Sequence, residues 1–186
     1  MILIRTLLFG IALLLLSSCQ TTPEKNYSNL IQQSSRSQKS YSGLHETFEA
    51  TVVPLNRKVT QGMLEKRAEL LGWTPERLQR EQQKANEERL THAKFFLRFF
   101  APNSDYDDLH KPNSIWKIYL LLGNQKIEGE VSRDFSKLIE LQAIYPGFDR
   151  FSTGYEVKFP IGQASLEDTS YSVQLTSSLG EAKFNF

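Results

Sequence analysis

Three aspartates in one short segment form the densest group of side chains that could bind a metal ion. Asp105, Asp107 and Asp108 lie within four residues of each other in the segment APNSDYDDLHKPNS, with Asn103 and His110 nearby. Carboxylate oxygens are hard ligands of the kind that calcium prefers, but the segment lacks the glycine and the distal glutamate of an EF-hand loop. Asp and Asn are also common in turns, where their side chains bond to the neighbouring backbone. We therefore interpret the segment as a turn, with calcium binding as the alternative.

The other polar residues match no catalytic motif. The three histidines, at positions 45, 92 and 110, give no HExxH pair and no Cys/His zinc pattern. GxSxG, glycine-rich phosphate loops and dinucleotide fingerprints are also missing from the sequence. Asp134 or Glu140 could pair with Glu156 as acid and base, but sequence spacing does not fix the distance that glycoside hydrolysis requires. The sequence thus predicts a non-catalytic protein without a cofactor, with a hydrolase assembled only in the folded chain as the alternative.

The single cysteine of the chain, Cys19, follows an apolar run near the N-terminus. Arg5 supplies a positive charge, and residues 7–16 are apolar and uncharged. Ten helical residues span about 15 Å, half of a bilayer core, so the segment has the proportions of a signal peptide. The sequence LSSC at 16–19 resembles the lipobox of bacterial lipoproteins, which is a leucine, two small residues and a cysteine. The alternative is an ordinary secretory signal with a chance cysteine.

This resemblance implies a lipid anchor. Cleavage would fall between Ser18 and Cys19, a diacylglyceryl group would join the Cys19 thiol as a thioether, and the new amino terminus would be acylated. One acyl chain anchors a protein only marginally, whereas three hold it effectively permanently. Gln20 stands where an aspartate commonly retains such lipoproteins in the inner membrane, so the resemblance favours the outer membrane.

The composition is that of an ordinary globular protein with a tail. Of the 186 residues, 40% are hydrophobic and 23% are charged, and the net charge of +1 argues against a nucleic-acid partner. After removal of a signal peptide over 1–18, the lipidated Cys19 would begin a segment, 19–44, that is rich in Ser and Gln. Such a segment buries too little surface to fold, so we expect it to be a flexible tether to a domain over 45–186.

The domain itself is predicted to be an antiparallel β-sandwich, immunoglobulin-like in the broad sense. Phe48, Ala50 and Val52 alternate with polar residues, as in a half-buried strand that should end at Pro54. Frequent short strands with turns between them are typical of a sandwich. Further strands are expected over 91–100, 115–122, 126–131, 138–145, 155–159, 171–175 and 182–186.

Residues 60–90 predict a two-helix insertion between the first and second expected strands. Apolar residues from Met63 to Leu71 recur at helical spacing, and Gly72 suits the position after a helix end. Thr74 and Pro75 then suit the cap and first turn of a second helix, which carries few apolar side chains. Such a helix is expected to expose most of its circumference.

One face of the strand over 91–100 is a candidate binding surface because it mixes aromatic and basic side chains. These are His92, Lys94, Phe96, Arg98 and Phe100. Residues of these types are enriched at recognition surfaces. The sequence favours the alternative, in which the second helix packs over this face and the Lys and Arg stems cover apolar surface.

Together these features predict a lipid-anchored protein of the bacterial outer membrane that acts as a binding or assembly module. Its partners would be the membrane, reached through the lipid on Cys19, and an unidentified protein of the cell envelope.

Overall fold

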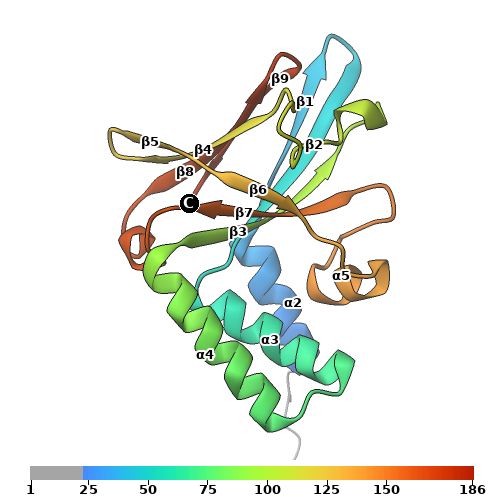
Figure 1. Cartoon of the computed structure of the whole chain (residues 1–186). Helices are drawn as coiled ribbons and strands as arrows, with labels where there is room; N and C mark the ends of the chain where they lie inside the picture. The colour runs from blue at the N-terminus through green and yellow to red at the C-terminus, as the bar shows by residue number, and fades with distance from the viewer. Residues whose placement is uncertain (1–22) are drawn as a thin grey trace, which may run out of the picture.

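The computed structural model describes residues 23–186 (Figure 1), so the signal segment and Cys19 lie outside the described residues. Nine strands in this part of the chain form two antiparallel sheets, and the fold is mainly β. The predicted two-sheet architecture is confirmed. Helices α2, α3 and α4 lie together at one end of the molecule, and the turn between β1 and β2 lies at the other (Figure 1).

The two sheets differ in size and share no strand. The larger sheet contains, in spatial order, β1 (Arg36–Ser42), β2 (His45–Pro54), β3 (Ala93–Phe100), β7 (Thr153–Phe159) and β6 (Glu130–Arg133). The smaller sheet contains, in spatial order, β5 (Gln125–Glu128), β4 (Lys117–Leu122), β8 (Tyr171–Ser177) and β9 (Gly180–Asn185). Every pair of neighbouring strands is antiparallel.

The main core lies between the sheets, and the alternation in β3 explains how it forms. The odd-numbered side chains of this strand, including Phe95 and Phe99, are fully buried, as the strand pattern predicts. The Trp116 ring lies edge-on to Phe48 and to Phe99, with centroids 4.9 and 5.0 Å away. Edge-to-face pairs of this kind add to the stabilisation from burial, so aromatic packing fixes how the two sheets face each other.

Contacts join the two sheets to each other at both lateral edges of the sandwich. At one edge the chain passes from β5 to β6 through Gly129, whose N–H donates to the Ile118 carbonyl at 2.9 Å. A Cβ at Gly129 would lie 2.6 Å from the Phe159 ring, so only glycine fits this crossing. At the other edge the Gln38 amide on β1 donates to the Lys183 carbonyl on β9 and accepts from its N–H, at 2.6 and 3.0 Å.

The predicted helical insertion is confirmed between β2 and β3. It consists of α3 (Arg57–Leu71) and α4 (Pro75–Thr91). Gly72 ends α3 in the left-handed conformation with φ of 61°, and the Thr74 hydroxyl caps α4 by accepting from the Arg77 N–H. No residue of α4 is fully buried, as its composition predicts.

The predicted tether is wrong for most of its length, because residues 23–42 are folded. Helix α2 (Pro23–Ser34) buries Ile31 against α3, and β1 pairs with β2 along its whole length. The polar, serine-rich composition of β1 is that of an edge strand held by backbone hydrogen bonds, with nearly all its side chains exposed. The folded domain therefore begins at Pro23 rather than at His45.

The expected strand over 138–145 is also wrong, since this segment is the short helix α5 (Leu138–Ile144). Its buried residues Leu141, Ile144 and Tyr145 are spaced by three and four positions, which is the helical pattern. Residues 23–186 also contain two single turns of 3-10 helix, η2 (Ser104–Tyr106) and η3 (Gln163–Leu166).

Candidate functional site

A cleft of about 420 Å³ lies between α4 and the outer face of the larger sheet. Helices α3 and α4 form one wall, and β3, β7 and the segment after β6 form the other. Its buried apolar lining comes from Leu55, Met63, Leu64, Phe96 and Tyr145. These residues belong to the second hydrophobic cluster of the molecule, which joins the helices to the sheet.

A stacked aromatic pair makes the floor of the cleft rigid. The rings of Phe96 and Tyr145 lie 3.5 Å apart between centroids and 4° from parallel. The Tyr145 hydroxyl donates to the Met63 sulfur at 3.4 Å. Burial raises the pKa of the Tyr145 phenol well above its ordinary value, so this group stays neutral and forms part of the apolar wall.

An ionised cluster spans the cleft from α4 to the sheet. The Lys94 ammonium on β3 lies 2.8 Å from the Glu88 carboxylate on α4 and 3.1 Å from the Glu156 carboxylate on β7. Burial by itself lowers the pKa of Lys94, but the hydrogen bond with Glu88 and the charge of Glu156 raise it overall. Burial likewise opposes ionisation of Glu88, but the hydrogen bond and charge of Lys94, together with the charges of Lys158 and Lys84, outweigh it and lower the Glu88 pKa below its usual value. Both groups are therefore held charged.

The carboxylates considered for a hydrolase each have a separate partner. Glu140 pairs with Arg67 on α3 at 3.1 Å, and Glu156 pairs with Lys94 and with Lys158. Asp134 accepts the Ser136 N–H at 2.8 Å in the turn that follows β6. Asp134 and Glu156 both line the cleft, whereas Glu140 does not. Glu140 and Glu156 thus join neighbouring elements, and Asp134 holds a local turn.

The aspartates of the candidate calcium loop point to different partners. Asp107 accepts the Tyr155 hydroxyl at 2.8 Å and is also hydrogen-bonded to Thr153, so it fastens the loop to β7. Asp108 accepts from Ser114 at 2.9 Å, while Asp105 lies in the exposed turn η2. Among residues 23–186, no three His, Cys, Asp or Glu side chains are arranged to hold a metal ion. The Asp105 N–H donates to the Asn103 side chain at 3.0 Å, which is the local contact of a turn.

The candidate binding surface on β3 is divided among four environments. Lys94 and Phe96 line the cleft, where the Phe96 ring packs on Tyr145 and Phe148, which follow α5, rather than under α4 alone as the alternative predicts. His92 is exposed at the end of α4, and Phe100 is half-buried at the far end of the strand. The structure thus brings two of the five residues into one site.

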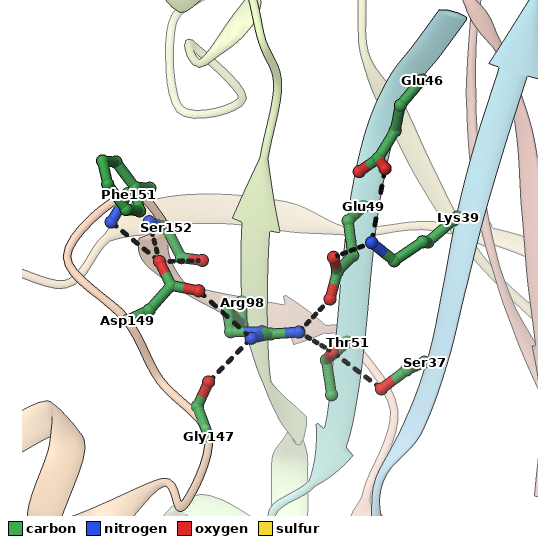
Figure 2. Close-up of polar contacts among 10 residues, drawn as sticks. All are labelled: Ser37, Lys39, Glu46, Glu49, Thr51, Arg98, Gly147, Asp149, Phe151 and Ser152. Carbon is green, nitrogen blue, oxygen red and sulfur yellow. Dashed lines mark hydrogen bonds and ion pairs between the residues drawn. The ribbon is translucent and has the colours of Figure 1, made fainter. Parts of the chain in front are cut away.

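Arg98, the remaining residue of that surface, is the centre of a separate polar network (Figure 2). Its guanidinium donates to the Gly147 carbonyl at 2.7 Å and to the Thr51 hydroxyl at 3.1 Å, and it pairs with Glu49. Glu49 also pairs with Lys39 at 2.8 Å. The network joins β1, β2 and β3 to the loop before β7, so Arg98 stabilises the fold instead of offering a free cation.

Comparison of the chain with protein-family models, with curated proteins and with solved structures found no match in any of the three. In the part of the chain that the structure describes, no helix has both the length and the apolar character needed to cross a membrane. The interpretation of the cleft therefore rests on its own geometry.

Proposed function

We propose that this chain is a lipid-anchored protein of the bacterial outer membrane that acts as a non-catalytic binding module through the cleft beneath α4. One observation supports the part of this proposal that concerns non-catalytic binding at the cleft. In the cleft, the Lys94 ammonium lies 2.8 Å from the Glu88 carboxylate and 3.1 Å from the Glu156 carboxylate, and the buried Tyr145 ring stacks on Phe96. These contacts and this burial displace three pKa values away from neutrality, with that of Glu88 lowered and those of Lys94 and Tyr145 raised.

This displacement disfavours proton transfer. A general acid or base works best when its pKa lies near the working pH, and active sites usually move pKa values toward neutrality. Here the environment stabilises the charge that Glu88 and Lys94 already carry at pH 7, and it keeps Tyr145 protonated. The arrangement supports a rigid recognition surface better than it supports the hydrolase alternative.

The mouth of the cleft has the composition of a contact surface. Phe135 belongs to the cleft lining and is 84% exposed, although it is a large apolar side chain. The Arg133 guanidinium lies 6.0 Å from the centre of its ring. Aromatic and arginine side chains contribute most to binding at protein interfaces. We therefore infer that the partner is a protein of the envelope that inserts an apolar group beside Phe135.

The anchor is tested by Cys19→Ala in the full-length protein. The variant is expected to lose labelling by radioactive palmitate and to leave the membrane fraction, because no other thiol can accept the lipid. Ser18→Ala is the matched control, since it keeps a small residue beside the cleavage site and should keep both properties. Continued membrane retention of Cys19→Ala would contradict the anchor.

The binding module is tested by photo-crosslinking in intact cells. A benzophenone amino acid in place of Phe135 is expected to capture one envelope protein, while the same group in place of Leu44 should not. Leu44 is 97% exposed in the turn between β1 and β2, and this turn lies at the opposite end of the molecule from α3 and α4 (Figure 1), so Leu44 controls for nonspecific capture. Equal capture at both positions would contradict a specific partner at the cleft.

A further inference from the structure

The start of the folded domain limits its distance from the proposed lipid. Helix α2 begins at Pro23, four residues after Cys19. An extended chain spans at most about 3.6 Å per residue, so these residues reach roughly 14 Å. A tether of 25 residues would hold the domain clear of the membrane, but a connection of four residues cannot. The inference that follows rests on the lipid anchor proposed above.

Helices α3 and α5 flank the first turns of α2, which lie nearest to that attachment point. The Tyr27 ring lies directly over Gly62 of α3, where a Cβ would come within 2.9 Å of it. The Tyr27 hydroxyl donates to the Ile144 carbonyl of α5 at 2.8 Å. The surfaces of α3 and α5 beside α2 are therefore the parts of the domain that the anchor brings closest to the lipid.

These two helices expose large apolar side chains at neighbouring ends. The exposed residues are Leu70 (42%) and Leu71 (48%) on α3 and Leu138 (43%) and Ile139 (69%) on α5, which we call the helical-end surface. The ion pair between Arg67 and Glu140, at 3.1 Å, joins the two helices beside it. Leu71 lies one helical turn beyond Arg67 on the same face, and Ile139 directly precedes Glu140.

Residues next to the helical-end surface suit a membrane interface. Trp73 follows Leu71 and Gly72, and the Arg77 guanidinium lies 4.5 Å from the centre of its ring. Lys137 is exposed at the start of α5, next to Leu138. Leucine and tryptophan beside basic side chains are typical of segments that lie at the boundary between headgroups and acyl chains.

We propose that the helical-end surface rests in the headgroup region of the membrane that holds the anchor. Lipid is the molecule that contacts this surface, because the short connection from Cys19 to α2 keeps α2, α3 and α5 close to the bilayer. The anchor and this surface then act together, and the second contact fixes the orientation of the domain. The cleft beneath α4 would thereby be presented at a constant angle to the membrane.

Trp73 provides the test, because the other tryptophan, Trp116, is buried between the sheets. The full-length lipidated protein is placed in vesicles of phosphatidylethanolamine and phosphatidylglycerol, with or without bromine on the acyl chains. We expect bromine to reduce the Trp73 emission about twofold, because interfacial side chains lie about 5–10 Å into the boundary region. Trp73→Phe, which leaves only Trp116, should show no quenching.

Substitutions separate this inference from the anchor. Leu71→Glu together with Ile139→Glu should abolish the quenching while the protein still sediments with the vesicles, and Leu44→Glu should leave both unchanged. Sedimentation without quenching in the unsubstituted protein would overturn the inference alone. Failure to sediment would contradict the anchor. Trp73 is already half-buried against the second hydrophobic cluster. Shielding of Trp73 from aqueous iodide that exceeds the shielding in the unlipidated protein, without quenching by bromine, would show that a second copy or another protein covers the surface, and would also overturn the inference.

Discussion

A chain shortened to begin at His45 is expected to lose its cooperative melting transition. The deletion removes α2 and β1 together. It removes Ile31 from the second hydrophobic cluster, to which Val59 and Met63 of α3 also belong, and it leaves β2 as an unpaired edge. Single domains are stabilised by only about 5–15 kcal/mol in total, and the loss of a strand and a helix is of that size. Circular dichroism during heating measures the effect.

A chain that begins at Pro23 is the matched control for this deletion. It keeps every described element and is expected to melt at the temperature of the chain without its signal segment. If the chain beginning at His45 melted at the same temperature as this control, residues 23–44 would contribute nothing to stability. The flexible tether predicted from composition would then be correct.

Phe96→Ala is expected to destabilise the domain by about 3–5 kcal/mol, the usual range for removal of a buried aromatic ring. The variant leaves a void beneath Tyr145, whose ring stacks on Phe96, and it removes a contact to Phe148. For a domain of this size the melting temperature should fall by roughly 10 °C. Urea unfolding measures the change in free energy directly.

Phe135→Ala is the control for the Phe96 variant, because it removes the same ring from a position that is 84% exposed. Its effect on stability should stay within about 0.5 kcal/mol. Similar values for the two substitutions would show that the helices do not pack on the outer face of the sheet as described. The cleft would then have no rigid floor.

The sequence predicts best those helices and strands whose own residues show a periodic or capping pattern. Alternation identifies the strand at Phe48–Val52, and the glycine and threonine at positions 72 and 74 mark the boundary between α3 and α4. Helix α2 and strand β1 are missed because their stability comes from partners elsewhere in the chain. Ile31 is the one fully buried residue among the described side chains of α2, and a single apolar residue gives no periodic pattern.

The cleft could be predicted only in part. Lys94 and Phe96 appear in the sequence as part of a mixed face, but nothing in their spacing identifies Glu88 and Glu156 as the partners of Lys94. The contact between Phe96 and Tyr145 joins residues on different elements, and the latter was expected to end a strand. A site formed by long-range contacts can be recognised only in the tertiary structure, because hydrophobic periodicity in the sequence describes each element separately.

The paired hydrogen bonds between Gln38 and Lys183 indicate the order in which parts of the domain fold during synthesis. They connect positions 145 residues apart, so the edge formed by β1 stays open until the last strand has been synthesised. Contacts of such separation form late and slow the folding of β proteins. The N-terminal strand β1 thus gains these contacts only when the C-terminal strand β9 is present. During translation, the nascent chain would expose the edge of β1 without its partner.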